Sequence, residues 1–145
     1  GNKLHLTYVE VAESGLRMVY RTRSHVQEWA NAMDMGPTVR HSTASSIDSK
    51  GRSWIFSIPP RNTGSHVLAE GEHERIYVHV IDPSTGEVTQ PLCIVSIPPQ
   101  HQVGRPVLAY TVPWVTASPI SPNRVGVVWM EGIGDQYQVM FRSIE

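Results

Sequence analysis

Residues 42–58 read STASSIDSKGRSWIFSI, and this stretch decides the fold class. Small polar residues with Thr43 and Ile47 make up its first half, and in its second half a short apolar run, Trp54 to Phe56, lies between Ser53 and Ser57. Between the halves lie Asp, Ser, Lys and Gly at positions 48–51. Short runs that contain apolar and β-branched residues and are bounded by turn-forming residues are typical of strands. The stretch therefore predicts a strand, a tight turn and a second strand.

The composition of the turn suggests how it forms. The side chain of Asp48 can accept backbone N–H groups within its own turn, and Gly51 can adopt a positive φ. Trp54, at the start of the second strand, is then expected to pack between neighbouring sheets.

The stretch recurs later in the chain. Residues 115–124, VTASPISPNR, match residues 42–51 without gaps at an offset of 73, and the same offset places Phe56 over Trp129. A second match joins the two ends, because Tyr8 and Trp129 are each followed 12 residues later by an aromatic residue, Tyr20 and Phe141. Recurrence at a fixed spacing indicates repeated structural units.

Aligned together, the copies predict a four-stranded antiparallel meander. The middle copy is complete, with strands near 42–47, 52–58, 75–81 and 88–94. The first copy begins at its second strand, with strands at 4–9 and 16–21. The last ends at its third, with strands at 126–130 and 136–144. Helical periodicity is nearly absent; a short helix over 24–35 is disfavoured because Gly36-Pro37 follows it at once.

We therefore predict a single all-β domain with about three β-propeller blades. They comprise a partial blade at 1–37, a full blade at 38–97 and a partial blade at 98–145. A propeller typically needs four to eight blades, so we expect copies of the chain, or other segments, to complete the ring. A β-sandwich is the alternative fold, with similar strands but no need for a partner.

Composition excludes several classes of function. The net charge is −1 and charged residues make up 17% of the chain, so there is no basic stripe for nucleic acid and no electrostatic membrane anchor. We expect Cys93, the only cysteine, to be a small buried hydrophobe. Residues 70–74, EGEHE, lack a second His at zinc spacing, and no phosphate-binding Gly loop occurs. We therefore predict no metal and no cofactor.

The motifs resemble a known family. Residues 46–54, SIDSKGRSW, are similar to the Asp-box of sialidase-like (BNR-repeat) β-propellers, S-x-D-x-G-x-x-W, with one extra residue before the Gly. Residues 16–24 followed by Trp29 resemble the third strand of such repeats, and residues 125–131 resemble the second. The resemblance implies a shared scaffold. We find no counterpart of the arginine triad, the Tyr/Glu nucleophile pair or the acid Asp of sialidases.

Candidate site residues come from the face of the meander that collects the long loops, 59–73 and 98–113, since binding usually lies on long loops over a rigid scaffold. Trp114 and His41 occupy equivalent places there, either as a sugar-stacking aromatic and a polar partner or base, or as core between blades and a hydrogen-bonded edge residue. Glu10 and Glu131 are equivalent at the ends of second strands, and Arg21 and Arg142 are equivalent as either an anion clamp or a salt bridge between blades. The predicted ligand-binding residues are Trp114, His41, Arg40, Arg61, His66, Arg105 and Glu10, and the predicted catalytic residues are His41 and Glu131.

These features favour a glycan-binding module, within a larger adhesin or a phage receptor-binding or depolymerase protein. Such a protein would act outside the cell, at a cell surface or on a virion. In this hypothesis Trp114→Ala abolishes sugar binding. The alternatives are a glycoside hydrolase or polysaccharide lyase whose site is shared with partner blades, and structural blades without a ligand.

Overall fold

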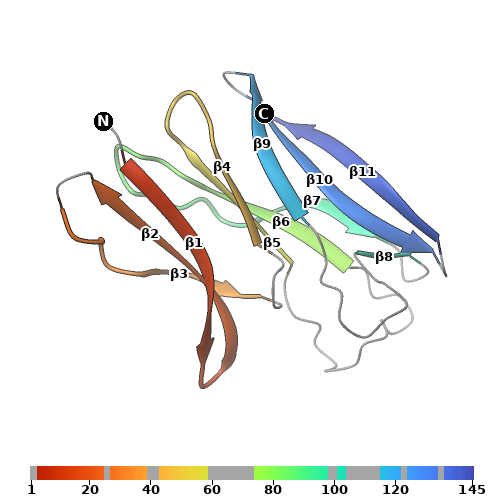
Figure 1. Ribbon diagram of the computed structural model, residues 1–145, viewed down its shortest axis with the longest axis horizontal. Coiled ribbons are helices and arrows are strands. Elements are labelled where there is room, and N and C mark those ends of the chain that lie inside the picture. The colour runs from red at the N-terminus through yellow and green to blue at the C-terminus, as the bar shows by residue number, and fades with distance from the viewer. Residues whose placement is uncertain are drawn as a thin grey trace.

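A computed structural model describes residues 3–24, 27–38, 43–58, 74–97, 101–103, 115–121, 124–133 and 136–145. These residues form eleven β-strands in three antiparallel sheets, and no helix occurs among them (Figure 1). The predicted all-β class is therefore confirmed. The described strands stack as three open sheets and do not close into a ring.

The first sheet has the order β1-β2-β3. Gly15, with φ 115°, ends the turn that joins its two long strands, a conformation that an L side chain rarely adopts. Residues 27–32, within the segment with weak helical periodicity, form no helix, and the sheet's third strand follows at once. The strands are β1 (Lys3–Ala12), β2 (Gly15–Ser24) and β3 (Met33–Pro37).

The middle sheet is the four-stranded meander β4-β5-β6-β7. Its strands agree with the predicted ones to within a few residues: β4 (Thr43–Ile47), β5 (Ser53–Ser57), β6 (Glu74–Ile81) and β7 (Leu92–Ile97). Cys93 in β7 is exposed, so the expectation of a buried cysteine is wrong. It alternates with the buried Ile94, and successive side chains of a strand point to opposite faces.

The last sheet is centred on β10, which pairs with β11 along one edge. Along the other edge β10 pairs with β9, and farther along with the short β8. The strands are β8 (His101–Val103), β9 (Val115–Ser121), β10 (Arg124–Ile133) and β11 (Gln136–Ile144).

The match between the two ends of the chain is confirmed by the strand register. Adding 121 to both members of the β1–β2 pair Tyr8↔Val19 gives the β10–β11 pair Trp129↔Met140, and the relation holds along both hairpins. The first sheet thus has the second, third and fourth strands of the meander, and the last sheet has its first, second and third.

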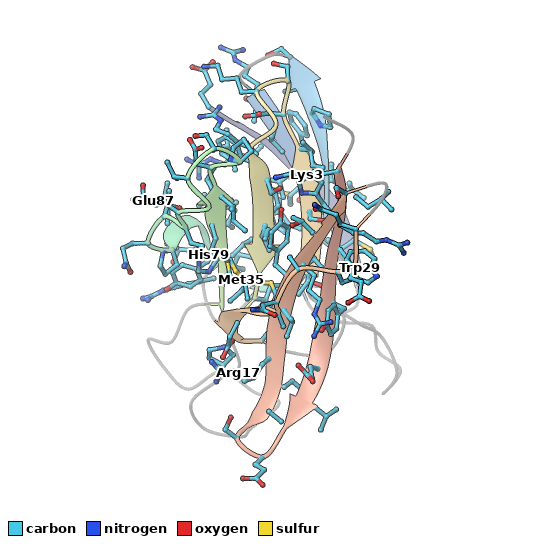
Figure 2. All side chains as sticks on the ribbon, turned by 90° about the vertical axis from the view of Figure 1, so that its left-hand side faces the viewer. Lys3, Arg17, Trp29, Met35, His79 and Glu87 are labelled. Carbon is cyan, nitrogen blue, oxygen red and sulfur yellow. The ribbon has the colours of Figure 1, made fainter. Side chains whose placement is uncertain are left out.

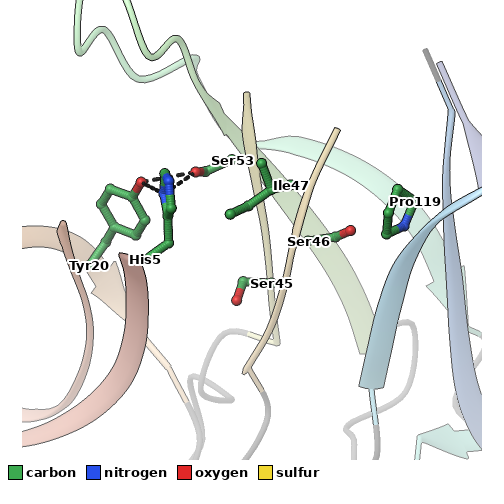
Figure 3. Close-up of a pocket in the computed structure, with 7 residues that line it drawn as sticks. All are labelled: His5, Tyr20, Ser45, Ser46, Ile47, Ser53 and Pro119. Atoms are coloured by element: carbon green, nitrogen blue, oxygen red, sulfur yellow. Dashed lines mark hydrogen bonds between the residues drawn. The ribbon is translucent and has the colours of Figure 1, made fainter. Parts of the chain in front are cut away.

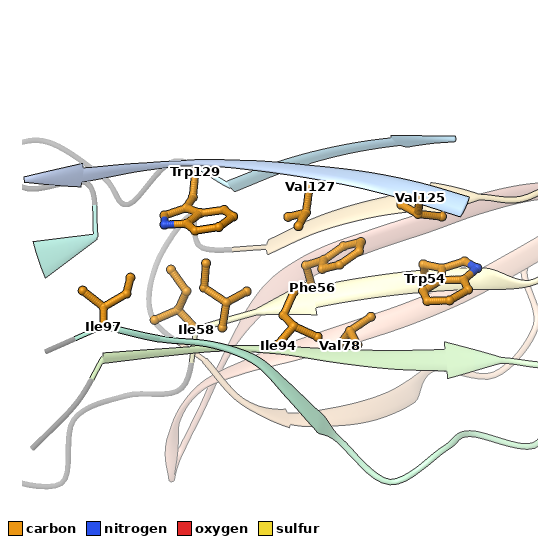
Figure 4. Packing of buried hydrophobic residues seen from close by; sticks show 10 residues of the cluster. Trp54, Phe56, Ile58, Val78, Ile94, Ile97, Val125, Val127 and Trp129 are labelled. Atoms are coloured by element: carbon orange, nitrogen blue, oxygen red, sulfur yellow. The ribbon is translucent and has the colours of Figure 1, made fainter. Parts of the chain in front are cut away.

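The offset of 73 is wrong by one residue. The five β4–β5 pairs reproduce five β9–β10 pairs when 72 is added to both members, so that Thr43↔Ser57 becomes Val115↔Trp129. A one-residue shift moves every side chain to the opposite face. Accordingly Phe56 and Trp129 are not equivalent positions: they lie on facing sides of one interface (Figure 4).

With this register, equivalent residues of the three sheets lie on the same side of their sheets. We call the side turned toward the next sheet along the chain the forward face, and the opposite side the rear face. The forward face of the middle sheet and the rear face of the last sheet enclose the larger core (Figure 4). Its buried residues are Trp54, Phe56, Ile58, Ile76, Val78, Ile94, Ile97, Val125, Val127 and Trp129.

A smaller core lies between the forward face of the first sheet and the rear face of the middle sheet. It contains Met18, Tyr20, Met35, Ile55 and Ile81. Strand β5 is consequently buried on both faces along its whole length. The middle sheet therefore holds the other two together.

The turn between β4 and β5 forms as predicted. The backbone N–H groups of Lys50 and Arg52 donate to Asp48 Oδ1 at 2.9 and 3.0 Å, and Gly51 has φ 77°. Arg52 Nε and Trp54 Nε1 donate to Asp48 Oδ2 at 2.7 and 3.0 Å. Burial opposes ionisation of this carboxyl, but the hydrogen bonds from Trp54 and Arg52 outweigh it and hold the pKa of Asp48 below its usual value.

Candidate functional site

Most of the predicted site residues lie outside the described part of the chain. They are Arg40, His41, Arg61, His66, Arg105 and Trp114. Their roles in ligand binding and catalysis remain predictions.

Glu10 and Glu131 lie on described strands. Glu10 is exposed in β1, opposite Arg17, and Glu131 lies in β10 between Val103 and Gln138. The two positions are equivalent at the offset of 121, as predicted. Their strands, however, belong to sheets on opposite faces of the middle sheet. Equivalence in the repeat therefore does not place the two residues in one sheet.

The described residues form a pocket beside β4, where the edges of the three sheets approach one another (Figure 3). It has a volume of about 290 Å³, at the small end of the range for ligand pockets. Strands β1 and β4 are in contact, and so are β4 and β9. The lining residues are His5, Tyr20, Ser45, Ser46, Ile47, Ser53 and Pro119.

Three of these side chains hydrogen-bond in a triangle. Nδ1 of His5 lies 2.6 Å from the hydroxyl of Tyr20 and 2.9 Å from Oγ of Ser53, and the two hydroxyls are 2.9 Å apart (Figure 3). The triangle joins the first sheet to the middle sheet. Tyr20 and Ser53 are buried, so their hydroxyls need partners within the protein or from a ligand.

The triangle keeps unused hydrogen-bonding capacity. A neutral imidazole either donates from Nδ1 or accepts there. If Nδ1 accepts, only two hydroxyl hydrogens serve three contacts. If Nδ1 donates, it cannot accept as well, and one hydroxyl hydrogen stays free. In both tautomers one contact carries no hydrogen, so a ligand can take up a remaining donor or lone pair.

The pocket is uncharged. Burial, with a smaller contribution from the charge of Lys3, lowers the pKa of His5 and favours the neutral imidazole. Burial raises the pKa of Tyr20, although the hydrogen bond with Ser53 partly opposes this, so the phenol stays protonated. The remaining lining residues are serines, Ile47 and Pro119. Polar recognition here therefore depends on neutral donors and acceptors.

Ser46 supplies the sharpest feature of the pocket. Its side chain projects from β4 on the side of Pro119 (Figure 3), the residue is 6% exposed, and its Oγ has no hydrogen-bond partner. An unpartnered buried hydroxyl costs about 1–3 kcal/mol. Its Oγ has less than 1 Å² of exposed surface, so a ligand hydroxyl or amide would satisfy it once the side chain turned from the side of Pro119 toward the open edge of β4.

The neutral state of His5 predicts a dependence of stability on pH. Since the folded state lowers its pKa below 6.5, the unfolded chain binds more protons as the pH falls, and the folded state loses stability. We expect the free energy of unfolding to fall between about pH 7.5 and pH 5, with a smaller fall in His5→Asn. Urea unfolding at several pH values measures this difference. If the free energy of unfolding fell with pH equally in the wild type and in His5→Asn, the prediction would be contradicted. His79→Asn should also reduce the fall, because burial lowers the pKa of His79 as well, and the reductions from the two variants should add because His79 lies outside the pocket.

No family model, curated protein or solved structure matches this chain.

Two other kinds of site are not found in the described ranges. No group of three or more metal-ligating side chains occurs among the described residues. That part of the chain likewise contains no helix long and apolar enough to cross a bilayer.

Sequence reasoning missed the pocket because it assigned binding to the long loops. One signal was available: Ser53 and Ser57 stand at the two ends of a strand that is otherwise apolar, and both are buried. Buried polar residues within a strand usually have partners. The partners, His5 and Tyr20, lie 48 and 33 positions away from Ser53, so only the folded chain identifies them.

Proposed function

We propose that this domain binds a neutral carbohydrate, and that its three sheets are consecutive blades of a β-propeller. The observation that carries the binding proposal is a pocket whose lining combines the buried, unpartnered hydroxyl of Ser46, on one side of β4, with the hydroxyls and imidazole of the His5–Tyr20–Ser53 triangle on the other side (Figure 3). Sugar hydroxyls are neutral and can both donate and accept. They therefore complement the mixed capacity of Ser46 and of the His5–Tyr20–Ser53 triangle.

The size and charge of the pocket narrow the class of ligand. A volume of about 290 Å³ suits one sugar ring better than an extended chain. An acidic sugar would place its carboxylate in a pocket whose lining residues include no Arg or Lys, and a buried unpaired charge is unfavourable. We therefore propose a neutral monosaccharide unit, presented alone or at the end of a glycan.

The packing of the sheets supports the propeller proposal. Each sheet is an antiparallel meander, and the forward face of each of the first two packs on the rear face of the next. Such stacking of equivalent units is the arrangement of repeat proteins and propeller blades. The edges around the pocket, β1, β4 and β9, would then lie nearest the axis of the propeller.

Ser46→Ala tests the binding proposal. Removing a buried hydroxyl that has no partner should leave stability unchanged or raise it by up to about 1 kcal/mol. Binding of the sugar should weaken about 5- to 10-fold, the loss of one hydrogen bond. Saturation-transfer NMR and calorimetry would measure binding of glucose, galactose, mannose and N-acetylglucosamine, with sialic acid as the anionic comparison.

Ser14→Ala is the matched control, because Ser14 is exposed in the turn between β1 and β2. It should change neither stability nor binding. If none of the neutral sugars binds, or if Ser46→Ala binds them as well as the wild type, this pocket is not the sugar site. Sialic acid binding more tightly than the neutral sugars would contradict the proposed ligand class.

A further inference from the structure

The forward face of the last sheet is apolar, and no other described sheet packs against it. Val139 and Phe141 on β11 are 73% and 62% exposed, and Ile120 on β9 is 50% exposed. Phe141 and Ile120 converge on Gly126, where an added Cβ would lie 2.9 and 3.1 Å from their side chains. Val128 and Met130 of β10, both half-buried, pair with Phe141 and Val139 and extend the patch. Contiguous exposed apolar groups of this kind mark an interaction surface.

The register identifies what this surface is equivalent to. An offset of 72 relates β5 to β10, and an offset of 63 relates β6 to β11. With these offsets the middle-sheet pair Phe56↔Val78 corresponds to the last-sheet pair Val128↔Phe141. The same offsets relate Ile76 to Val139. Phe56, Val78 and Ile76 are buried under the rear face of the last sheet. The exposed patch is therefore the last sheet's version of a face that is covered in the middle sheet.

The complementary surface is the rear face of the first sheet, which is turned toward the viewer in Figure 2. Leu4 and Leu6 on this face are 58% and 41% exposed. At the offset of 121, Leu4, Leu6 and Tyr8 correspond to Val125, Val127 and Trp129. These are the residues with which the last sheet covers the middle sheet.

A buried polar atom on this rear face also lacks a partner. Nε of Arg21 makes no hydrogen bond. Arg21 corresponds to Arg142, which donates from Nη1 to the backbone oxygen of Ile94 across the internal interface. Arg142 therefore makes a hydrogen bond between sheets, and Arg21 occupies the equivalent position on a face against which no other described sheet packs.

We propose that two copies of this chain associate head to tail, the forward face of each last sheet covering the rear face of the partner's first sheet. The contact would repeat the internal interface between the middle and last sheets. Because the two surfaces differ, the association is heterologous, and it ends only if the sheets close into a ring. Two copies bring three sheets each, six in all, within the usual range of four to eight blades.

Light scattering coupled to gel filtration, over a wide range of concentration, tests the proposal. The expected mass is twice 16.2 kDa. Phe141→Asp and Leu6→Asp should each give a monomer, because each places a charge in both copies of the contact. Leu92→Asp, at a 61% exposed position on β7, should leave the mass unchanged. Thermal unfolding of each variant checks that it folds. If Phe141→Asp does not fold, Val139→Asp replaces it, and if Leu6→Asp does not fold, Leu4→Asp replaces it.

Mixing the two monomeric variants distinguishes this arrangement from others. Phe141→Asp retains an intact first sheet and Leu6→Asp an intact last sheet, so the mixture should form a heterodimer through one contact. A monomeric wild type would overturn the proposal. So would a dimer that is lost with Phe141→Asp but kept with Leu6→Asp, which would mean self-association of the last sheet. None of these outcomes depends on sugar binding.

Discussion

Phe56→Ala is expected to lower the free energy of unfolding by about 3–5 kcal/mol. Phe56 has no exposed surface and lies between the middle and last sheets, in contact with the core that includes Trp129. Truncation removes its apolar contacts and leaves a cavity that a tightly packed interface fills only in part.

Truncation of the neighbouring residue, Ile55, should destabilise the protein by a similar amount, and this similarity distinguishes the prediction from one for a sheet with a single buried face. Ile55 is also fully buried, but in the smaller core against the first sheet, so Ile55→Ala should cost about 2–5 kcal/mol. In a sheet covered on one side only, adjacent residues would differ sharply. Urea unfolding measures both variants, and Leu92→Ala, at an exposed position of the same sheet, should stay within about 0.5 kcal/mol of the wild type. A small effect for either Ile55→Ala or Phe56→Ala would contradict the three-layer packing.

Asp48→Ala is expected to cost roughly 2–4 kcal/mol, since it removes a buried acceptor and leaves buried donors unpaired. Asp48 accepts two backbone and two side-chain hydrogen bonds. Trp54 Nε1 would lose its acceptor inside the core, and the turn would lose the side chain that fixes its shape. Asp82→Ala is the matched control, because Asp82 accepts hydrogen bonds from Ser84 and Thr85 in an exposed turn. Its effect should be much smaller.

The contribution of ionised Asp48 to stability should disappear at acid pH. Its pKa is lowered in the folded state, so its contribution is complete above the usual carboxyl pKa and is lost as the pH falls through the lowered value. The difference in unfolding free energy between the wild type and Asp48→Asn should therefore shrink on acidification. A difference that stays constant from neutral pH into the acid range would show that the charge of Asp48 does not contribute.

Much of the fold could be predicted because it depends on local patterns. The short apolar run around Trp54 and Phe56, bounded by turn-forming residues, predicted a strand, and Asp48 and Gly51 predicted the turn that the structure contains. The recurrence of an aromatic pair at the two ends predicted a true equivalence, and the strand register confirms it. The candidate site could not be predicted in this way, because its hydrogen bonds join residues that are far apart in the sequence.

The sequence by itself determined that this protein is built from repeated antiparallel strands, and which residues form the turns between them. Those properties follow from side-chain alternation and turn chemistry within a few residues. Only the tertiary structure decided which face each residue occupies. Strand side chains alternate with a period of two, so the one-residue error in the offset of 73 exchanged the two faces. The correct register, fixed by backbone hydrogen bonds between strands, brings His5, Tyr20 and Ser53 together and leaves Phe141 exposed on the forward face of the last sheet.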